Sequence, residues 1–273
     1  MFPFRRVLVA ADCGGVDVDL LSYAAALLAR SPQTSVTVAA RPQLPAAPKF
    51  AALARSMFAA RGLRDVSCRY LADPDWEEIH DTARHCSADL LIARAPARIA
   101  SPGRWFSLPD APCALWLAPP STRGCPRRIV ASVSLDAAAR SVIETAFRVA
   151  SATGADDVIA LHVFSGPVLD PGDDNTERLS EDRRLDLYGL TARIDADGVP
   201  CLLEVAESLD PPGKAARFAE QAGAGLVVST PDSIDLSVSE RVAVLMLAGN
   251  GRSPSRSWRL KRRRTPLFEP VFN

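Results

Sequence analysis

Two stretches of the chain share one pattern of apolar and polar positions. Residues 5–12 and 127–134 both open with paired arginines, continue through small and β-branched apolar residues, and end on a short polar residue. A continuous apolar run between polar residues is typical of a strand buried on both faces of a parallel sheet. We therefore predict that one domain begins at the first stretch and that a related domain begins 122 residues later.

Between the two stretches, the pattern alternates between strand and helix periodicity. Leucines and alanines at helical spacing follow Asp17 and Asp19, and either carboxylate could cap that helix. Asp73-Pro74 has the form of a helix start, with Asp as the N-cap and Pro in the first turn. Beyond the opening strand, the predicted strands are 35–40, 66–71, 89–93 and 113–118, and the predicted helices are 20–28, 50–61 and 73–85.

The second part of the chain repeats this order of elements. Asp210-Pro211 corresponds to Asp73-Pro74, and residues 87–96 correspond to residues 223–231. The predicted strands are 129–133, 157–164, 201–206, 225–229 and 242–248, and the predicted helices are 137–152, 176–195 and one that opens at Asp210. Strands that alternate with helices in this way predict a doubly wound α/β domain, present twice.

The fold class is therefore α/β, with two tandem doubly wound domains, each a five-stranded mainly parallel sheet flanked by helices. We place the first domain at 1–119, a Pro-rich linker at 120–127 and the second domain at 128–249. Residues 250–273 form a basic C-terminal tail that we expect to be flexible. With 48% hydrophobic and 23% charged residues, the composition is globular. Asp12 interrupts the first apolar run too early for a signal peptide, and no run is long enough to span a membrane, so we expect a cytoplasmic protein.

Candidate chemistry is sparse. The six cysteines form no CxxC pair, which favours reduced thiols packed as small apolar groups over a metal site. His80 and His85 are five residues apart on one predicted helix, so they lie on different faces. His162 lies inside a predicted strand, where we expect a packed structural histidine. We therefore expect no metal site, no catalytic residue and no enzymatic activity.

Several of these features together resemble the universal stress protein family. They are a strand that ends at Asp12, an Ala-rich helix, a late Ala-Asp-Leu-Leu-Ile-Ala strand from Ala88, and an Ala-Pro-Cys-Ala-Leu-Trp-Leu segment from Ala111. Both halves fit, so the chain resembles a tandem universal stress protein over about residues 4–248. The resemblance implies a role in the stress response. It also implies that the last strands can mediate dimers, so that the chain forms either an intramolecular pseudo-dimer or a homodimer.

Family members that bind ATP share a glycine motif after the fourth strand, in which backbone amides approach the phosphates. This sequence departs from the motif in both halves. The corresponding positions are about Arg94, Ala97 and Ser107 in the first half, with only Gly103 nearby, and about Thr230, Ser233 and Ala243 in the second. The resemblance therefore implies that the phosphate site is lost and that no cofactor is bound, although ATP or AMP remains an alternative ligand.

Two residues are candidates if a nucleotide is bound. Asp12 matches the acidic residue that contacts the nucleotide in ATP-binding relatives, and Ser134 is its counterpart in the second half. The simpler interpretation is that each ends a buried strand and starts a turn. Arg94, together with Arg98, could bind phosphate through its guanidinium group. The alternative, which we favour at this stage, is that both arginines are solvated loop charges.

The formal net charge is zero, but it is unevenly distributed. Residues 252–264 contain seven basic residues and no acidic one, which leaves a net charge of −7 on the rest of the chain. We do not expect this run to bind nucleic acid or anionic lipid, because a single basic run is a weak signal. The sequence thus favours a non-enzymatic protein that acts through protein contacts. The alternatives are an adenine-nucleotide sensor that uses Asp12 and an adaptor that binds an anionic partner through the tail.

Overall fold

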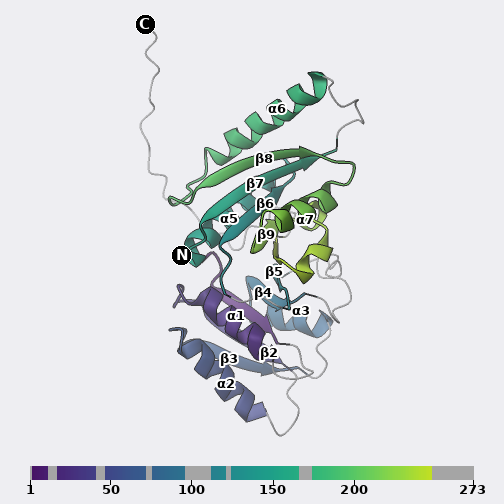
Figure 1. The fold of residues 1–273 in the computed structure, drawn as a ribbon. Helices are drawn as coiled ribbons and strands as arrows, with labels where there is room; N and C mark the ends of the chain where they lie inside the picture. Colours follow the sequence, from purple (N-terminus) through teal and green to yellow (C-terminus); the bar gives the residue numbers. More distant parts are fainter. Residues whose placement is uncertain are drawn as a thin grey trace.

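The computed structural model describes residues 2–11, 17–40, 47–71, 76–95, 112–120, 124–165 and 174–247. Its first half alternates strands and helices (Figure 1). The elements are β1 (Arg6–Ala10), α1 (Val18–Leu28), β2 (Ser35–Ala40), α2 (Ala47–Ala59), β3 (Val66–Tyr70), α3 (Trp76–His85), β4 (Leu90–Arg94) and β5 (Ala114–Ala118).

The second half repeats this order and adds two short 3₁₀ helices before its last strand. Its elements are β6 (Arg128–Val133), α5 (Ala139–Thr153), β7 (Asp157–Phe164), α6 (Asp174–Thr191), β8 (Cys201–Glu207), α7 (Pro211–Gln221), β9 (Leu226–Ser229), η1 (Pro231–Ser233), η2 (Leu236–Glu240) and β10 (Ala243–Met246).

The described strands form one ten-stranded sheet in the order β3-β2-β1-β4-β5-β10-β9-β6-β7-β8. Neighbouring strands are parallel within each half, and the two halves meet where β5 and β10 run antiparallel. Trp116 lies opposite Leu245 at this joint. The two halves thus pair internally through their last strands, which is the pseudo-dimer arrangement that the resemblance implied.

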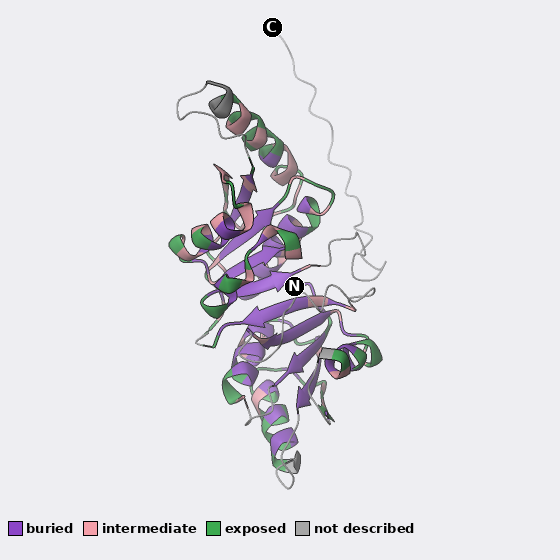
Figure 2. Cartoon of the chain, turned by 90° about the vertical axis from the view of Figure 1, so that its right-hand side faces the viewer, coloured by how far each residue is buried: buried purple, intermediate pink, exposed green. Residues whose placement is uncertain are grey.

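Helices cover both faces of the sheet, as right-handed crossovers between parallel strands require. The buried side chains of α1, α2, α5 and α6 pack on one face, and those of α3, α7 and η2 pack on the other. Figure 2 shows the central strands as the most continuously buried part of the chain. The predicted α/β class and doubly wound order are confirmed, and the two five-stranded units are joined into one sheet.

Local sequence signals explain several element boundaries. The Asp17 carboxylate accepts a hydrogen bond from the Leu20 amide at 2.8 Å, so the N-cap of α1 is Asp17 rather than Asp19. Asp210 caps α7 in the same way, with Pro211 in the first turn. Gly154 ends α5 in the left-handed conformation, at a φ of 74°. The start predicted at Asp73 lies outside the described residues.

The prediction was wrong at the end of α6. The helix stops at Thr191 rather than Asp195, because the chain turns there and the Ile194 amide donates to the Thr191 carbonyl at 3.0 Å. This turn lets Ile194 pack against the core. Within the described part of the chain, no helix is both long enough and apolar enough to cross a membrane.

Candidate ligand crevices at the carboxyl ends of the strands

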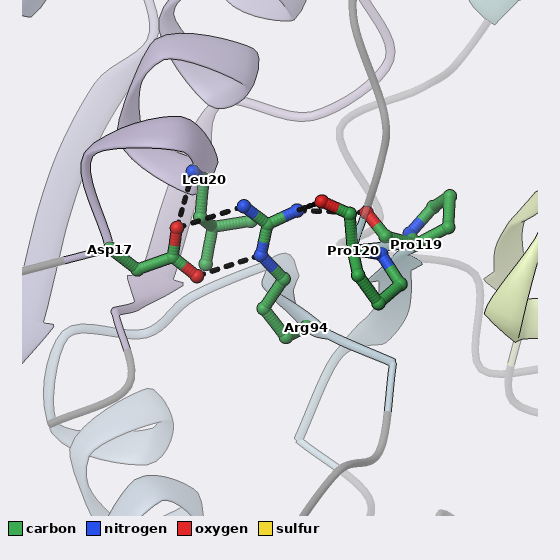
Figure 3. Close-up of polar contacts among 5 residues, drawn as sticks. All are labelled: Asp17, Leu20, Arg94, Pro119 and Pro120. Carbon is green, nitrogen blue, oxygen red and sulfur yellow. Dashed lines mark hydrogen bonds and ion pairs between the residues drawn. The ribbon is translucent and has the colours of Figure 1, made fainter. Parts of the chain in front are cut away.

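A doubly wound sheet presents its ligand crevice at the carboxyl ends of its central strands. In the first half, Arg94 is the last residue of β4, and Asp17 caps the helix that follows β1. Their side chains form a two-point ion pair (Figure 3). Arg94 Nε donates to Asp17 Oδ2 at 2.7 Å, and Arg94 Nη2 donates to Asp17 Oδ1 at 2.8 Å.

The remaining donors of Arg94 bind the segment that leaves β5. Nη1 donates to the Pro119 carbonyl at 2.8 Å and lies 3.4 Å from the Pro120 carbonyl. The Arg94 and Asp17 side chains are only 16% and 18% exposed. Arg94 thus connects three segments, namely the start of α1, the end of β4 and the chain beyond β5, as Figure 3 shows.

Electrostatics favour the charged form of Asp17. Burial by itself raises the pKa of this carboxyl. The hydrogen bonds from Arg94 and from the Leu20 amide, together with the positive charge of Arg94, outweigh burial and hold the pKa of Asp17 below its usual value of 3.8. The ion pair is therefore intact at neutral pH.

The interpretation of Arg94 as a solvated loop charge was wrong. The side chain lies at the end of a strand, is mostly buried and is fully engaged. Asp12 and Arg98 lie outside the described residues, as do Ala97, Gly103 and Ser107. Sequence analysis identified Asp17 only as a helix cap. No sequence signal indicates its pairing with Arg94, because the two residues are 77 positions apart.

A cluster of hydroxyl groups occupies the corresponding place in the second half. Ser134 follows β6, Thr230 follows β9, and Ser233 ends η1. The Ser233 Oγ lies 2.9 Å from Ser134 Oγ and 2.8 Å from Thr230 Oγ1. Ser132 Oγ also donates to the Ser233 carbonyl at 3.0 Å. The 3₁₀ turn η1 is thus bonded across the ends of β6 and β9, in the crevice where a doubly wound sheet would place a ligand.

His162 is a packed side chain, as predicted. It is 6% exposed, its Nδ1 lies 2.9 Å from the Val133 carbonyl, and its ring stacks on Phe164. Burial lowers the pKa of His162, and the hydrogen bond to Val133 only partly opposes this effect. Within the described ranges, no group of three His, Cys, Asp or Glu side chains could hold a metal ion. The described cysteines are free thiols, and burial raises the pKa of Cys113.

The ion pair predicts a pH-dependent effect of Asp17→Asn. At neutral pH we expect this variant to lower the free energy of unfolding by about 1–2 kcal/mol, because Asn can still cap the helix but cannot pair with Arg94. Since the folded pKa of Asp17 is depressed, the stabilisation is fully present above about pH 5. It is lost as the pH falls through the folded pKa. Urea unfolding between pH 7 and pH 2.5 measures the difference from the wild type.

Asp19→Asn is the matched control, since Asp19 is exposed in the first turn of the same helix. We expect it to change stability by less than about 0.5 kcal/mol at neutral pH. A penalty for Asp17→Asn that stays constant down to pH 2.5 would contradict a stabilised Asp17 carboxylate.

Structural comparison supports the tandem arrangement. The chain is similar to a candidate universal stress protein from Pseudomonas aeruginosa UCBPP-PA14, with a TM-score of 0.67 and 18% identity over 89% of this chain and 93% of the other. It is also similar to a protein of unknown function from Pseudomonas aeruginosa PAO1, with a TM-score of 0.62 and 19% identity over 89% and 92% of the two chains.

A universal stress protein from Archaeoglobus fulgidus DSM 4304 matches with a TM-score of 0.50 and 13% identity over 88% of this chain and 95% of the other. No family model and no curated protein matches the sequence. The likeness therefore lies in three-dimensional structure and extends over most of each chain. The chain has the universal stress protein fold, and its two halves are joined through β5 and β10.

Proposed function

We propose that this chain is a non-enzymatic protein of the universal stress protein type, which acts in a stress response through contacts with other proteins and has lost ATP binding in both halves. One observation carries the proposal. At the carboxyl ends of both β4 and β9, the polar groups that the structure describes are already bonded to other groups of the same chain.

In the first half, this engagement works against a phosphate ligand. A guanidinium binds phosphate well because it offers paired donors and a positive charge. Arg94 presents its paired donors to Asp17, whose carboxylate also neutralises the charge. A phosphate would have to displace a partner that is tethered and mostly buried. The glycine motif that supplies backbone donors in ATP-binding relatives is missing at the matching positions.

In the second half, η1 lies in the crevice where a ligand would bind. Its Ser233 bonds to hydroxyls at the ends of both β6 and β9, so an incoming nucleotide would have to break at least two hydrogen bonds within the chain. Thr230 stands where the first glycine of the motif is expected, and its side chain is part of this cluster. The engagement of the described groups at both strand ends favours a protein that acts through contacts on its outer surface.

The expected result of a calorimetric titration of the full chain with ATP is no saturable heat at millimolar nucleotide. Because the described polar groups at the strand ends are already bonded within the chain, we expect Asp12→Ala to titrate like the wild type. Asp19→Ala serves as a matched control, because it removes a nearby carboxylate from an exposed position. Saturable binding that Asp12→Ala abolishes and Asp19→Ala preserves would overturn the proposal in favour of an adenine-nucleotide sensor.

Native mass spectrometry of the protein purified from its own cells extends this test to ligands that remain bound. We expect the bare mass of the chain, with or without protein partners. A co-purified mass of ATP or AMP would show that another cradle has replaced the glycines and would contradict the loss of nucleotide binding.

A further inference from the structure

The outer edge of the second half is an unusual surface. The last strand of the sheet is β8, which pairs with β7 and, among the described strands, with no other. The described large apolar side chains that are at least half exposed all lie on or beside α6 and β8, the two elements that Figure 1 labels at the outer end of the second half. These side chains are Leu185 and Tyr188 at 60% each, Leu202 at 50% and Leu209 at 79%.

Side-chain directions place part of this apolar surface beside the free strand edge. Leu187 of α6 is fully buried in the core. Tyr188 is the next residue, so its side chain is rotated by about 100° around the helix axis from that of Leu187. The opposite flank of α6 forms a groove with Arg140 of α5, lined by Leu185, Asp186, Gly189, Leu190 and Arg193. Tyr188 and Glu181 therefore lie on the flank of α6 that is turned away from α5, towards the unpaired edge of β8. Within β8, Cys201, Leu203 and Val205 pack on the same core as Leu187. Since side chains alternate along a strand, Leu202 and Glu204 point to the opposite face of the sheet from α6.

The segment that contains α6 and β8 carries most of the acidic excess of the chain. Residues 174–210 contain ten carboxylates and four arginines, a net charge of −6. Because residues 252–264 carry +7 and the whole chain is neutral, all other residues together have a net charge of only −1. In the part of the chain that the structure describes, the side chains of Glu181, Glu204 and Glu207 make no hydrogen bond or ion pair.

We propose that the basic segment 252–264 of the same chain docks across this outer edge, where Glu181 and Tyr188 lie on the α6 side and Leu202 and Glu204 lie on the opposite face of β8. The seven cations complement carboxylates that lack partners in the rest of the structure. Trp258 and Leu260 alternate with Arg259 and Lys261, so the segment also offers apolar groups to Tyr188 and Leu202. A docked tail would cover a strand edge that could otherwise pair with another chain.

The length of the chain permits this docking. Leu247 follows β10, which is parallel to β9, β6, β7 and β8, so the tail leaves from the same side of the sheet as the carboxyl end of β8. The two strands are four positions apart, or about 19 Å at ~4.8 Å per strand. The five residues from Leu247 to Arg252 can span up to about 17 Å and the seventeen to Arg264 up to about 58 Å. A tether of this length also raises the effective concentration of the segment at the edge.

Zero-length carbodiimide crosslinking of the full chain tests the proposal, because this reagent joins lysine amines only to carboxylates in direct contact. The chain has three lysines, at positions 49, 214 and 261, so a crosslink from the tail is identified by Lys261 alone. We expect Lys261 to couple to Glu181, Glu204 or Glu207 several-fold more often than to Asp65 or Glu77 in the first half. At 1 M NaCl, where the Debye length falls to about 3 Å, these crosslinks should decrease strongly.

The full-chain variant Glu181→Gln/Glu204→Gln/Glu207→Gln should lose the crosslinks from Lys261 to the outer edge. Asp65→Asn/Glu77→Gln, which removes exposed carboxylates at the other end of the sheet, should retain them. Coupling of Lys261 that is spread evenly over the body, or absent, would overturn the proposal. In a mixture of ¹⁴N- and ¹⁵N-labelled protein, mixed-isotope crosslinks would identify a second copy as the owner of the docked tail and would overturn docking within one chain.

Discussion

Replacing Trp116 with alanine is expected to lower the free energy of unfolding by about 3–5 kcal/mol, the range for deleting a large buried aromatic side chain. Trp116 is fully buried at the middle of β5. Its ring lies 6.4 Å from the rings of both Phe2 and Tyr23, measured between centroids. Urea unfolding followed by far-UV circular dichroism measures the loss, because a lower midpoint at an unchanged slope reports a lower free energy of unfolding.

A milder variant separates the loss of volume from the loss of the polar contact. The indole Nε1 of Trp116 donates to the Tyr23 hydroxyl at 3.2 Å inside the core. Tyr23→Phe removes that acceptor and leaves the indole N–H without it, at a cost of about 1–3 kcal/mol, while the ring packing is retained. A Trp116→Ala variant that is destabilised by less than about 1 kcal/mol would contradict the close packing of this cluster.

Local pattern was sufficient to predict the order of elements. The strand over residues 157–164 was predicted with the bounds of β7, and the Asp-Pro start of α7 was found from its capping chemistry. These signals are short-range, because a strand is encoded by its own apolar run and a helix start by three or four neighbouring residues. The repeat then extended the local predictions to a tandem α/β architecture.

The site contacts could not be predicted in the same way. Arg94 and Asp17 are separated by 77 residues, and Ser134 and Ser233 by 99. Each pair consists of ordinary surface residue types that become partners only after parallel strands bring their carboxyl ends to one edge of the sheet. The turn η1 was also missed, because Pro231-Asp232-Ser233 has the composition of any loop. Its role depends on its hydrogen bonds to hydroxyl groups at the ends of β6 and β9.

The antiparallel joint explains why the two halves form one folded unit. Two separate parallel sheets would each expose the edge of a last strand, β5 or β10, and such edges tend to pair with other chains. Here the edges of β5 and β10 hydrogen-bond to each other, so each of these central strands is buried between neighbouring strands on both sides. The sheet retains two edges, at β3 and β8, and the acidic apolar edge is β8. The edge at β8 is the one that the basic segment 252–264 is proposed to cover.

The second large effect is expected at the same joint, from Leu245→Asp. Leu245 is fully buried in β10, opposite Trp116 on one side and Val228 on the other. A carboxylate at this position has no cation to pair with in the described surroundings, so burying it costs several kcal/mol beyond the lost packing. Because natural domains are stable by about 5–15 kcal/mol, we expect the variant to lose most of its cooperative thermal transition.

Leu245→Met is the matched control, because it keeps the side chain apolar and of similar volume and should cost less than about 1.5 kcal/mol. Differential scanning calorimetry of both variants also tests whether the halves unfold together. Since Trp116 and Leu245 pack across the joint, damage on the β10 side should destabilise both halves and leave no native-like transition for the first half alone. If Leu245→Asp instead retains a wild-type transition, the buried joint between β5 and β10 does not hold the two halves together in solution.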